Sequence, residues 1–118
     1  MPDGDNYLFG NNSEPIYNRG GGDNILNGGT GEDTLYGGSG RDMFVLASES
    51  GSDTIFNFTV GSDHFGLMSG LTFEQLTITQ GIGTNISDTL ISKQDGVLAT
   101  LIGVEANTLS LWDFANLG

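Results

Sequence analysis

This 118-residue chain has no cysteine, a single histidine and few basic residues. The absence of cysteine excludes disulfides, thiolate metal ligands and a cysteine nucleophile. The one histidine, His64, excludes a zinc site built on several histidines. Fifteen acidic residues against Arg19, Arg41 and Lys93 leave a formal net charge of −12. Such a chain repels nucleic acid and anionic membrane surfaces, so no nucleic-acid partner is expected, and it attracts cations.

Long apolar segments are missing as well. No stretch approaches the about 20 apolar residues that a transmembrane helix needs, so no membrane insertion is expected. The N-terminus lacks the basic head and apolar run of a cleaved secretory signal. The length allows one domain, or a repeat array with a flanking cap. Because Met1 stands directly before a repeat block, we expect a fragment of a larger protein, and a naturally short chain is the alternative.

Glycine, by contrast, occurs 20 times, and much of it lies in phase with a nine-residue repeat. Residues 1–45 divide into five blocks, and a sixth block covers residues 48–56 after a two-residue slip. The sixth position of the blocks reads Asn6, Pro15, Asn24, Asp33, Asp42 and Asp53. The eighth position is always apolar or aromatic and reads Leu8, Tyr17, Leu26, Leu35, Phe44 and Ile55. A flexible glycine-rich linker has no such phase, so the period indicates a β-solenoid.

The repeat predicts an all-β fold, a parallel β-roll of nonapeptide repeats over residues 1–56. In each block the first six residues favour a turn, and the last three favour a short strand whose apolar residue points inward. Two blocks make one coil, so each block stacks on the block two further along. Strands about 4.7–4.9 Å apart then place Asp33 over Asp53 on one edge and Asn24 under Asp42 on the other. Two carboxylates so close repel each other, and one stays protonated unless a cation lies between them.

Residues 57–118 leave the repeat and are expected to form a C-terminal antiparallel β cap that closes the roll. Alternating apolar residues predict strands over residues 64–68, 75–80, 88–93 and 97–103. Asp95 and Gly96 are a hairpin signal between the last two strands. Residues 72–75 fit a capping box, which predicts a short helical turn.

Blocks three to six resemble RTX (repeats-in-toxin) calcium-binding repeats, also called hemolysin-type calcium-binding repeats. Residues 53–67 resemble the junction that follows such repeats in the C-terminal domains of serralysin-type secreted proteins. The resemblance implies a calcium-binding, non-catalytic module of a larger bacterial protein, which the type I secretion machinery exports to the extracellular space. The apolar tail at residues 109–118 is similar to the uncleaved secretion signals of that family.

The resemblance also implies ligands, namely turn carbonyls and the sixth-position acids. One site is expected from Gly29, Gly31 and Asp33 with Ser48, Ser50 and Asp53. A second is expected from Gly20, Gly22 and Asn24 with Gly37, Ser39 and Asp42. A third is expected from Gly38, Gly40 and Asp42 with Asp63. Because Asn6 and Asn24 are neutral and Pro15 offers no side-chain ligand, about two to three Ca²⁺ ions are expected, and an all-oxygen site favours Ca²⁺ over Mg²⁺.

The first functional interpretation is a folding switch. The chain stays unfolded inside the cell, where calcium is scarce, and folds outside when calcium binds the folded state. A carbohydrate- or surface-binding adhesin module is the alternative, because Tyr7, Phe9 and Tyr36 occupy outward positions. A hydrolase would need His64 as a base, but no nucleophile elbow accompanies it. We therefore expect the module itself to have no enzymatic activity. The larger protein is expected to carry an N-terminal enzyme or adhesin domain as its partner.

Overall fold

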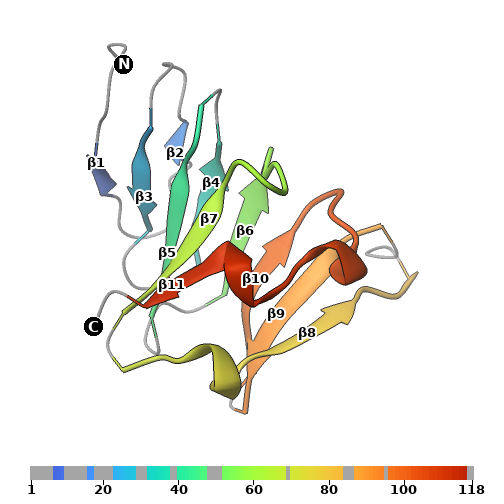
Figure 1. Cartoon of the computed structure of the whole chain (residues 1–118). Helices are drawn as coiled ribbons and strands as arrows, with labels where there is room; N and C mark the ends of the chain where they lie inside the picture. Colours follow the sequence, from blue (N-terminus) through green and yellow to red (C-terminus); the bar gives the residue numbers. More distant parts are fainter. Residues whose placement is uncertain are drawn as a thin grey trace.

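The computed structural model describes residues 7–9, 16–17, 23–28, 32–37, 40–47, 52–68, 70–83, 87–94 and 96–116, with the backbone alone for residues 7–9 and 16–17. Across these residues the regular structure consists of β-strands and short 3₁₀ turns (Figure 1). The all-β prediction is therefore confirmed. None of the helical turns in this described part is long and apolar enough to span a membrane.

The strands form two sheets. The first has the order β1 (Tyr7–Phe9), β3 (Ile25–Asn27), β5 (Met43–Ala47), β7 (His64–Met68) and β11 (Phe114–Asn116), and all its pairings are parallel. The second has the order β2 (Ile16–Tyr17), β4 (Thr34–Tyr36), β6 (Asp53–Phe56), β10 (Gly96–Leu101), β9 (Thr89–Lys93) and β8 (Thr77–Gln80). Strands of consecutive blocks alternate between the sheets, so two blocks make one coil, as a β-roll requires.

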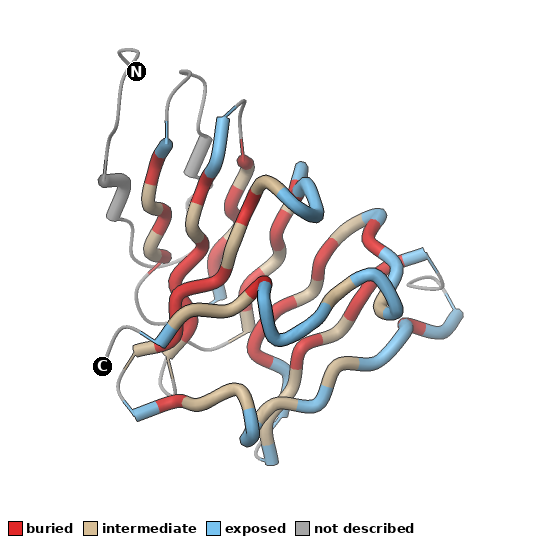
Figure 2. Tube along the Cα trace, in the orientation of Figure 1, coloured by how far each residue is buried: buried red, intermediate tan, exposed pale blue. Residues whose placement is uncertain are grey.

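The register places the eighth position of each block beside the same position one coil later. Leu26 pairs with Phe44 in the first sheet, and Leu35 pairs with Ile55 in the second. All four side chains are fully buried in one apolar cluster. Buried and partly exposed residues alternate along β3, β4 and β6, whereas β5 buries three consecutive residues (Figure 2). The core of the described blocks is therefore thin, and each inward side chain contributes about 1.5–3 kcal/mol on burial.

The C-terminal half continues both sheets. β10 pairs parallel with β6 and antiparallel with β9, and β9 pairs antiparallel with β8. β11 pairs parallel with β7. The prediction of a purely antiparallel cap is therefore not confirmed, because the strands that meet the roll run parallel to it. These two junctions cover the edges that β6 and β7 would otherwise leave unpaired.

Local signals explain where the C-terminal strands begin. The strand expected over residues 75–80 begins at Thr77, because the 3₁₀ turn η1 (Phe73–Gln75) precedes it. The N–H of Thr72 donates to Oε1 of Gln75 at 3.0 Å, which is half of the expected capping box. Gly96 opens β10 with φ 143°, a value that suits glycine. Asp95 lies outside the described residues. Two further 3₁₀ turns, η3 (Ala106–Thr108) and η4 (Leu111–Asp113), lead to β11.

A cluster of aromatic rings joins the roll to its C-terminal strand. Phe65 of β7 is fully buried and stacks on Phe58 at 4.7 Å and on Phe114 of β11 at 5.1 Å between ring centroids. The ring of Phe44, from the repeat, lies 6.3 Å from it. Phe65 therefore ties three separate segments of the chain together.

We expect Phe65→Ala to destabilise the folded protein by about 3–5 kcal/mol, because it removes a buried ring and leaves a cavity. The change is measured from urea unfolding curves. Trp112→Ala, at a site 84% exposed, is the matched aromatic control and should change stability by no more than about 0.5 kcal/mol. Equal effects of the two substitutions would contradict the central role of Phe65.

Candidate metal centre

The sixth-position residues form two columns, one on each edge of the roll. One column contains Asn24, Asp42 and Asp63, and the other contains Asp33 and Asp53. All five side chains are at most 2% exposed, although aspartate is seldom fully buried unless it is paired. The structure places Asp33 beside Asp53, Asn24 beside Asp42, and Asp42 beside Asp63, which are the three neighbour pairs that the sequence analysis predicted.

Hydrogen bonds between coils hold these acids in place. The N–H of Asp33 donates to Oδ1 of Asp53 at 3.1 Å, and the N–H of Asp42 donates to Oδ1 of Asp63 at 2.8 Å. In return, the N–H groups of Thr54 and His64 donate to the carbonyl oxygens of Asp33 and Asp42. Oδ1 of Asp53 and Oδ1 of Asp63 therefore each accept a hydrogen bond from the preceding coil.

The other carboxylate oxygens are also shielded from solvent. Oδ2 of Asp53 is buried and accepts no hydrogen bond from any described residue, and Oδ2 of Asp33 and of Asp42 are buried as well. A buried anionic oxygen without a partner is costly. A hard cation such as Ca²⁺ would use this oxygen as a ligand.

Burial changes the acidity of these groups. Burial raises the pKa of Asp53 to about 7, opposed by the hydrogen bond from the N–H of Asp33 and reinforced by the negative charge of that residue. Burial also raises the pKa of Asp63, against the hydrogen bonds from Thr59 and Asp42 and the nearby His64. Both shifts show that the fold accommodates these carboxylates poorly as free anions.

Glycines make room beside the acids. A Cβ atom at Gly28 would lie only 2.8 Å from Oδ2 of Asp33, so a side chain there would occupy the space that the carboxylate faces. A Cβ at Gly37 would approach the carbonyl oxygen of Asn57 to 3.1 Å and the ring of Phe44 to 3.0 Å. Gly28 was not among the predicted site residues.

Several predicted ligands lie outside the described residues: Gly20, Gly22, Gly29, Gly31, Gly38, Ser39, Ser48 and Ser50. Of the other predicted carbonyl ligands, Gly37 is buried and Gly40 is exposed with φ 87°. In the described part of the chain no three His, Cys, Asp or Glu side chains gather as a metal cluster. The acids meet in pairs, so a bound ion would take its remaining ligands from carbonyl groups or water. The ligand roles stay predictions.

One inter-coil contact was missed by the sequence analysis. Asp23 is exposed, but its Oδ1 accepts a hydrogen bond from the backbone N–H of Arg41 at 3.0 Å. Both residues occupy the fifth position of their blocks, one coil apart, but the donor is a backbone group, so the residue types gave no signal of the contact.

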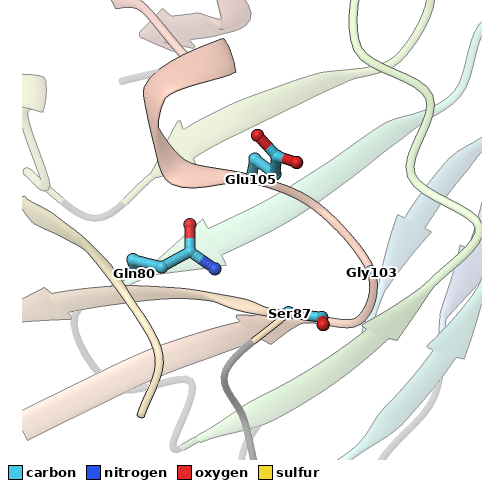
Figure 3. Close-up of a pocket in the computed structure, with 4 residues that line it drawn as sticks. All are labelled: Gln80, Ser87, Gly103 and Glu105. Atoms are coloured by element: carbon cyan, nitrogen blue, oxygen red, sulfur yellow. The ribbon is translucent and has the colours of Figure 1, made fainter.

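A separate polar pocket of about 300 Å³ lies in the C-terminal half, lined by Gln80, Ser87, Gly103 and Glu105 (Figure 3). Its polar groups are used by the fold: Oε1 of Gln80 accepts from the N–H of Ala106 at 2.9 Å, and Oδ1 of the buried Asp88 accepts from the N–H of Gly103 at 2.7 Å. Asp88 therefore serves the structure, and the pocket is not part of the candidate metal centre.

Comparison with known proteins agrees with this geometry. Residues 19–55 match the family model described as the RTX calcium-binding nonapeptide repeat, in four copies. This segment therefore consists of RTX calcium-binding repeats, which confirms the resemblance drawn from the sequence. No curated protein sequence matches the chain significantly.

Two solved structures share the fold. The extracellular lipase LipA from Serratia marcescens is 23% identical over 96% of this chain, with a TM-score of 0.56, and this chain spans 20% of the lipase. The AlgE6R3 subunit of the mannuronan C5-epimerase from Azotobacter vinelandii is 22% identical over 96% of this chain and 78% of its own, with a TM-score of 0.55. At these identities the likeness shows a common fold alone.

The raised pKa of Asp53 predicts that the metal-free fold is more stable at low pH than at high pH. The carboxyl group binds its proton more tightly in the folded chain, where its pKa is about 7, than in an unfolded chain with the ordinary pKa of 3.8. Its stabilising contribution is thus complete below pH 3.8 and is lost as pH rises through 7. We expect urea midpoints and far-UV circular dichroism in calcium-free buffer to show a more stable fold at pH 5 than at pH 8. Asp53→Asn should flatten this dependence, and an unchanged slope would contradict the assignment.

Gly28→Ala should weaken calcium binding and cost about 1–3 kcal/mol of stability, because the added methyl group collides with the carboxylate of Asp33. Calcium affinity is measured by isothermal titration calorimetry. Gly83→Ala is the control: its φ of 64° makes alanine strained, but no atom lies within 4 Å, so stability should fall while calcium affinity stays constant. The prediction is wrong if both variants retain wild-type affinity.

Proposed function

We propose that the RTX calcium-binding repeats at residues 19–55 form a module that folds when calcium enters its turns and that is unstable without the ion. The buried pair Asp33 and Asp53 carries the proposal. One coil brings the two carboxylates together, and Oδ2 of Asp53 is left without a hydrogen bond from the described residues. A divalent cation removes both the repulsion and the unsatisfied oxygen.

The ligand sets follow the two acid pairs. At the first, Asp33 and Asp53 bind one ion with carbonyl groups of Gly29, Gly31, Ser48 and Ser50. At the second, Asp42 and Asp63 bind another with carbonyl groups of Gly38 and Gly40. Asn24 and Asp42 do not form an acid pair, because Asn24 carries an amide. Six or more oxygens in a flexible turn suit Ca²⁺ better than Mg²⁺, which demands strict octahedral geometry.

Calcium binding can drive folding if several sites act together. An ion that binds only the folded state stabilises it by about 1.4 kcal/mol for each tenfold excess over Kd. Extracellular calcium modules have Kd values of about 10⁻⁴–10⁻³ M. One such site therefore contributes little at millimolar calcium, and several sites coupled through adjacent coils are required.

The cellular role that fits is export. Low calcium in the cytosol keeps the chain unfolded for the type I secretion machinery, and calcium outside folds it as part of a larger secreted enzyme or adhesin. In this proposal residues 1–56 are the calcium-binding roll, and residues 57–118 close its open end and carry the secretion signal. Leu111 and Trp112 support the last point, because they are 51% and 84% exposed near the C-terminus. The likeness to an extracellular lipase supports the location.

The alternative, carbohydrate or surface binding by outward aromatic residues, receives less support. Of the residues it relied on, Tyr36 is the one whose side chain is described. Its ring stacks on Phe56 at 4.6 Å with an interplanar angle of 7°, so one face of each ring is covered by the other. The likeness to the AlgE6R3 subunit keeps a glycan screen in calcium worthwhile as a direct test.

The decisive experiment is a calcium titration of the metal-stripped protein, followed by far-UV circular dichroism with magnesium as the ionic control. We expect a cooperative gain of β-structure near millimolar calcium and none with magnesium. Asp53→Asn should lose one bound ion and raise the calcium midpoint. Glu74→Gln removes the same charge at an exposed residue of η1 and should behave as wild type. A metal-stripped protein that is already fully folded, or no calcium binding, would refute the switch.

A further inference from the structure

We infer that Asn24 and Asp23 close the junction between the third and fifth blocks (residues 19–27 and 37–45) in place of a calcium ion. The inference rests on the proposed function, because it concerns which turns of the roll require the ion. It also reverses the predicted second site, in which Asn24 was a weak calcium ligand.

The amide of Asn24 is directed at the acid one coil away. Its Nδ2 donates to Oδ1 of Asp42 at 3.2 Å, and its own backbone N–H donates to the same oxygen at 3.1 Å. A carboxylate oxygen only accepts hydrogen bonds, so the contact fixes the amide with its nitrogen toward Asp42. The positive end of the amide dipole therefore lies where an ion between two carboxylates would lie, and both residues are buried.

The opposite edge of the roll provides an internal comparison. There the backbone N–H of Asp33 makes the corresponding bond to Oδ1 of Asp53 at 3.1 Å. The side chain at this level is a carboxylate instead of an amide, and it adds negative charge beside Asp53 where Asn24 adds a donor. The backbone geometry is the same on both edges, so the side chain alone decides whether the junction needs a cation.

Asp23 strengthens the same junction from its exposed side. Its Oδ1 accepts a hydrogen bond from the N–H of Arg41 at 3.0 Å. The side chains of Asp23 and Asn24 thus contact two consecutive residues of the fifth block. In addition, the N–H of Met43 donates to the carbonyl oxygen of Asn24 at 2.8 Å. Together these bonds join the coils without any ion.

A calcium-independent junction beside calcium-dependent ones has a consequence for folding. The coils at Asn24 and Asp42 remain joined when calcium is scarce, while the junctions at Asp33 and at Asp63 separate. Calcium-driven folding then starts from a preformed coil, which lowers the entropy cost of ordering the next one.

Asn24→Asp tests the inference, because it restores an acid pair with almost no change in volume. We expect calorimetry to count one more calcium ion than in the wild type. Circular dichroism without calcium should show a loss of residual structure, and the calcium midpoint of folding should rise about fivefold or more because of the added like charge. The matched reverse change, Asp33→Asn on the other edge, should lose one ion and gain structure without calcium. Asp23→Ala should lower the metal-free stability, and Asp23→Asn, which keeps the acceptor, should not.

The outcomes separate the inference from the proposed function. If the wild type already binds an ion at this level, so that Asn24→Asp leaves the count unchanged, the inference is overturned while the calcium switch stands. If the wild type binds no calcium but Asn24→Asp still destabilises the metal-free protein relative to wild type, the switch fails and the role of Asn24 as the joining group stands. Unaltered metal-free stability in both Asn24→Asp and Asp23→Ala overturns the inference.

Discussion

The repulsion between buried carboxylates one coil apart sets the condition under which this roll is stable. The strands of the repeats contain two to five residues, and each described block buries only one or two apolar side chains. Ordering each residue costs about 1–2 kcal/mol of backbone entropy, and glycine loses more than any other residue. In the proposed mechanism the turns therefore decide the balance, and the acid pairs make the turns conditional on a cation.

Asp42 and Asp53 each serve two purposes through their two oxygens. Oδ1 accepts a backbone N–H from the preceding coil, whereas Oδ2 lies buried and suits an ion. This division explains why an amide can replace one acid of a pair without loss of register. The backbone hydrogen bond to Asp42 does not depend on the side chain of residue 24, so the replacement changes the demand for metal and leaves the coil in place.

Much of this arrangement was predictable because a nine-residue period fixes both neighbours and direction. The pairing of Leu35 with Ile55, and of Asp33 with Asp53, follows from counting two blocks per coil. The parallel docking of β10 on β6 and of β11 on β7 was not predictable, because strand partners more than 40 residues apart leave no local pattern. The space beside Gly28 and the bond from Arg41 to Asp23 depend on distances within the turns, which residue types alone do not give.

In the proposed mechanism, the ends of the two columns confine calcium binding to the repeats and to Asp63, which follows them. On one edge the residue in register with Asp53 is Ala99 of β10, so no further acid follows. On the other edge Asp63 closes the column, and its two oxygens accept hydrogen bonds from the N–H groups of Asp42 and Thr59. Backbone donors to Asp63 and the aromatic packing around Phe65 thus add contacts at the C-terminal end that involve no ion. The proposed ion between Asp42 and Asp63 is then the last one in its column, and β10 and β11 join the roll through strand pairing instead of acid pairs.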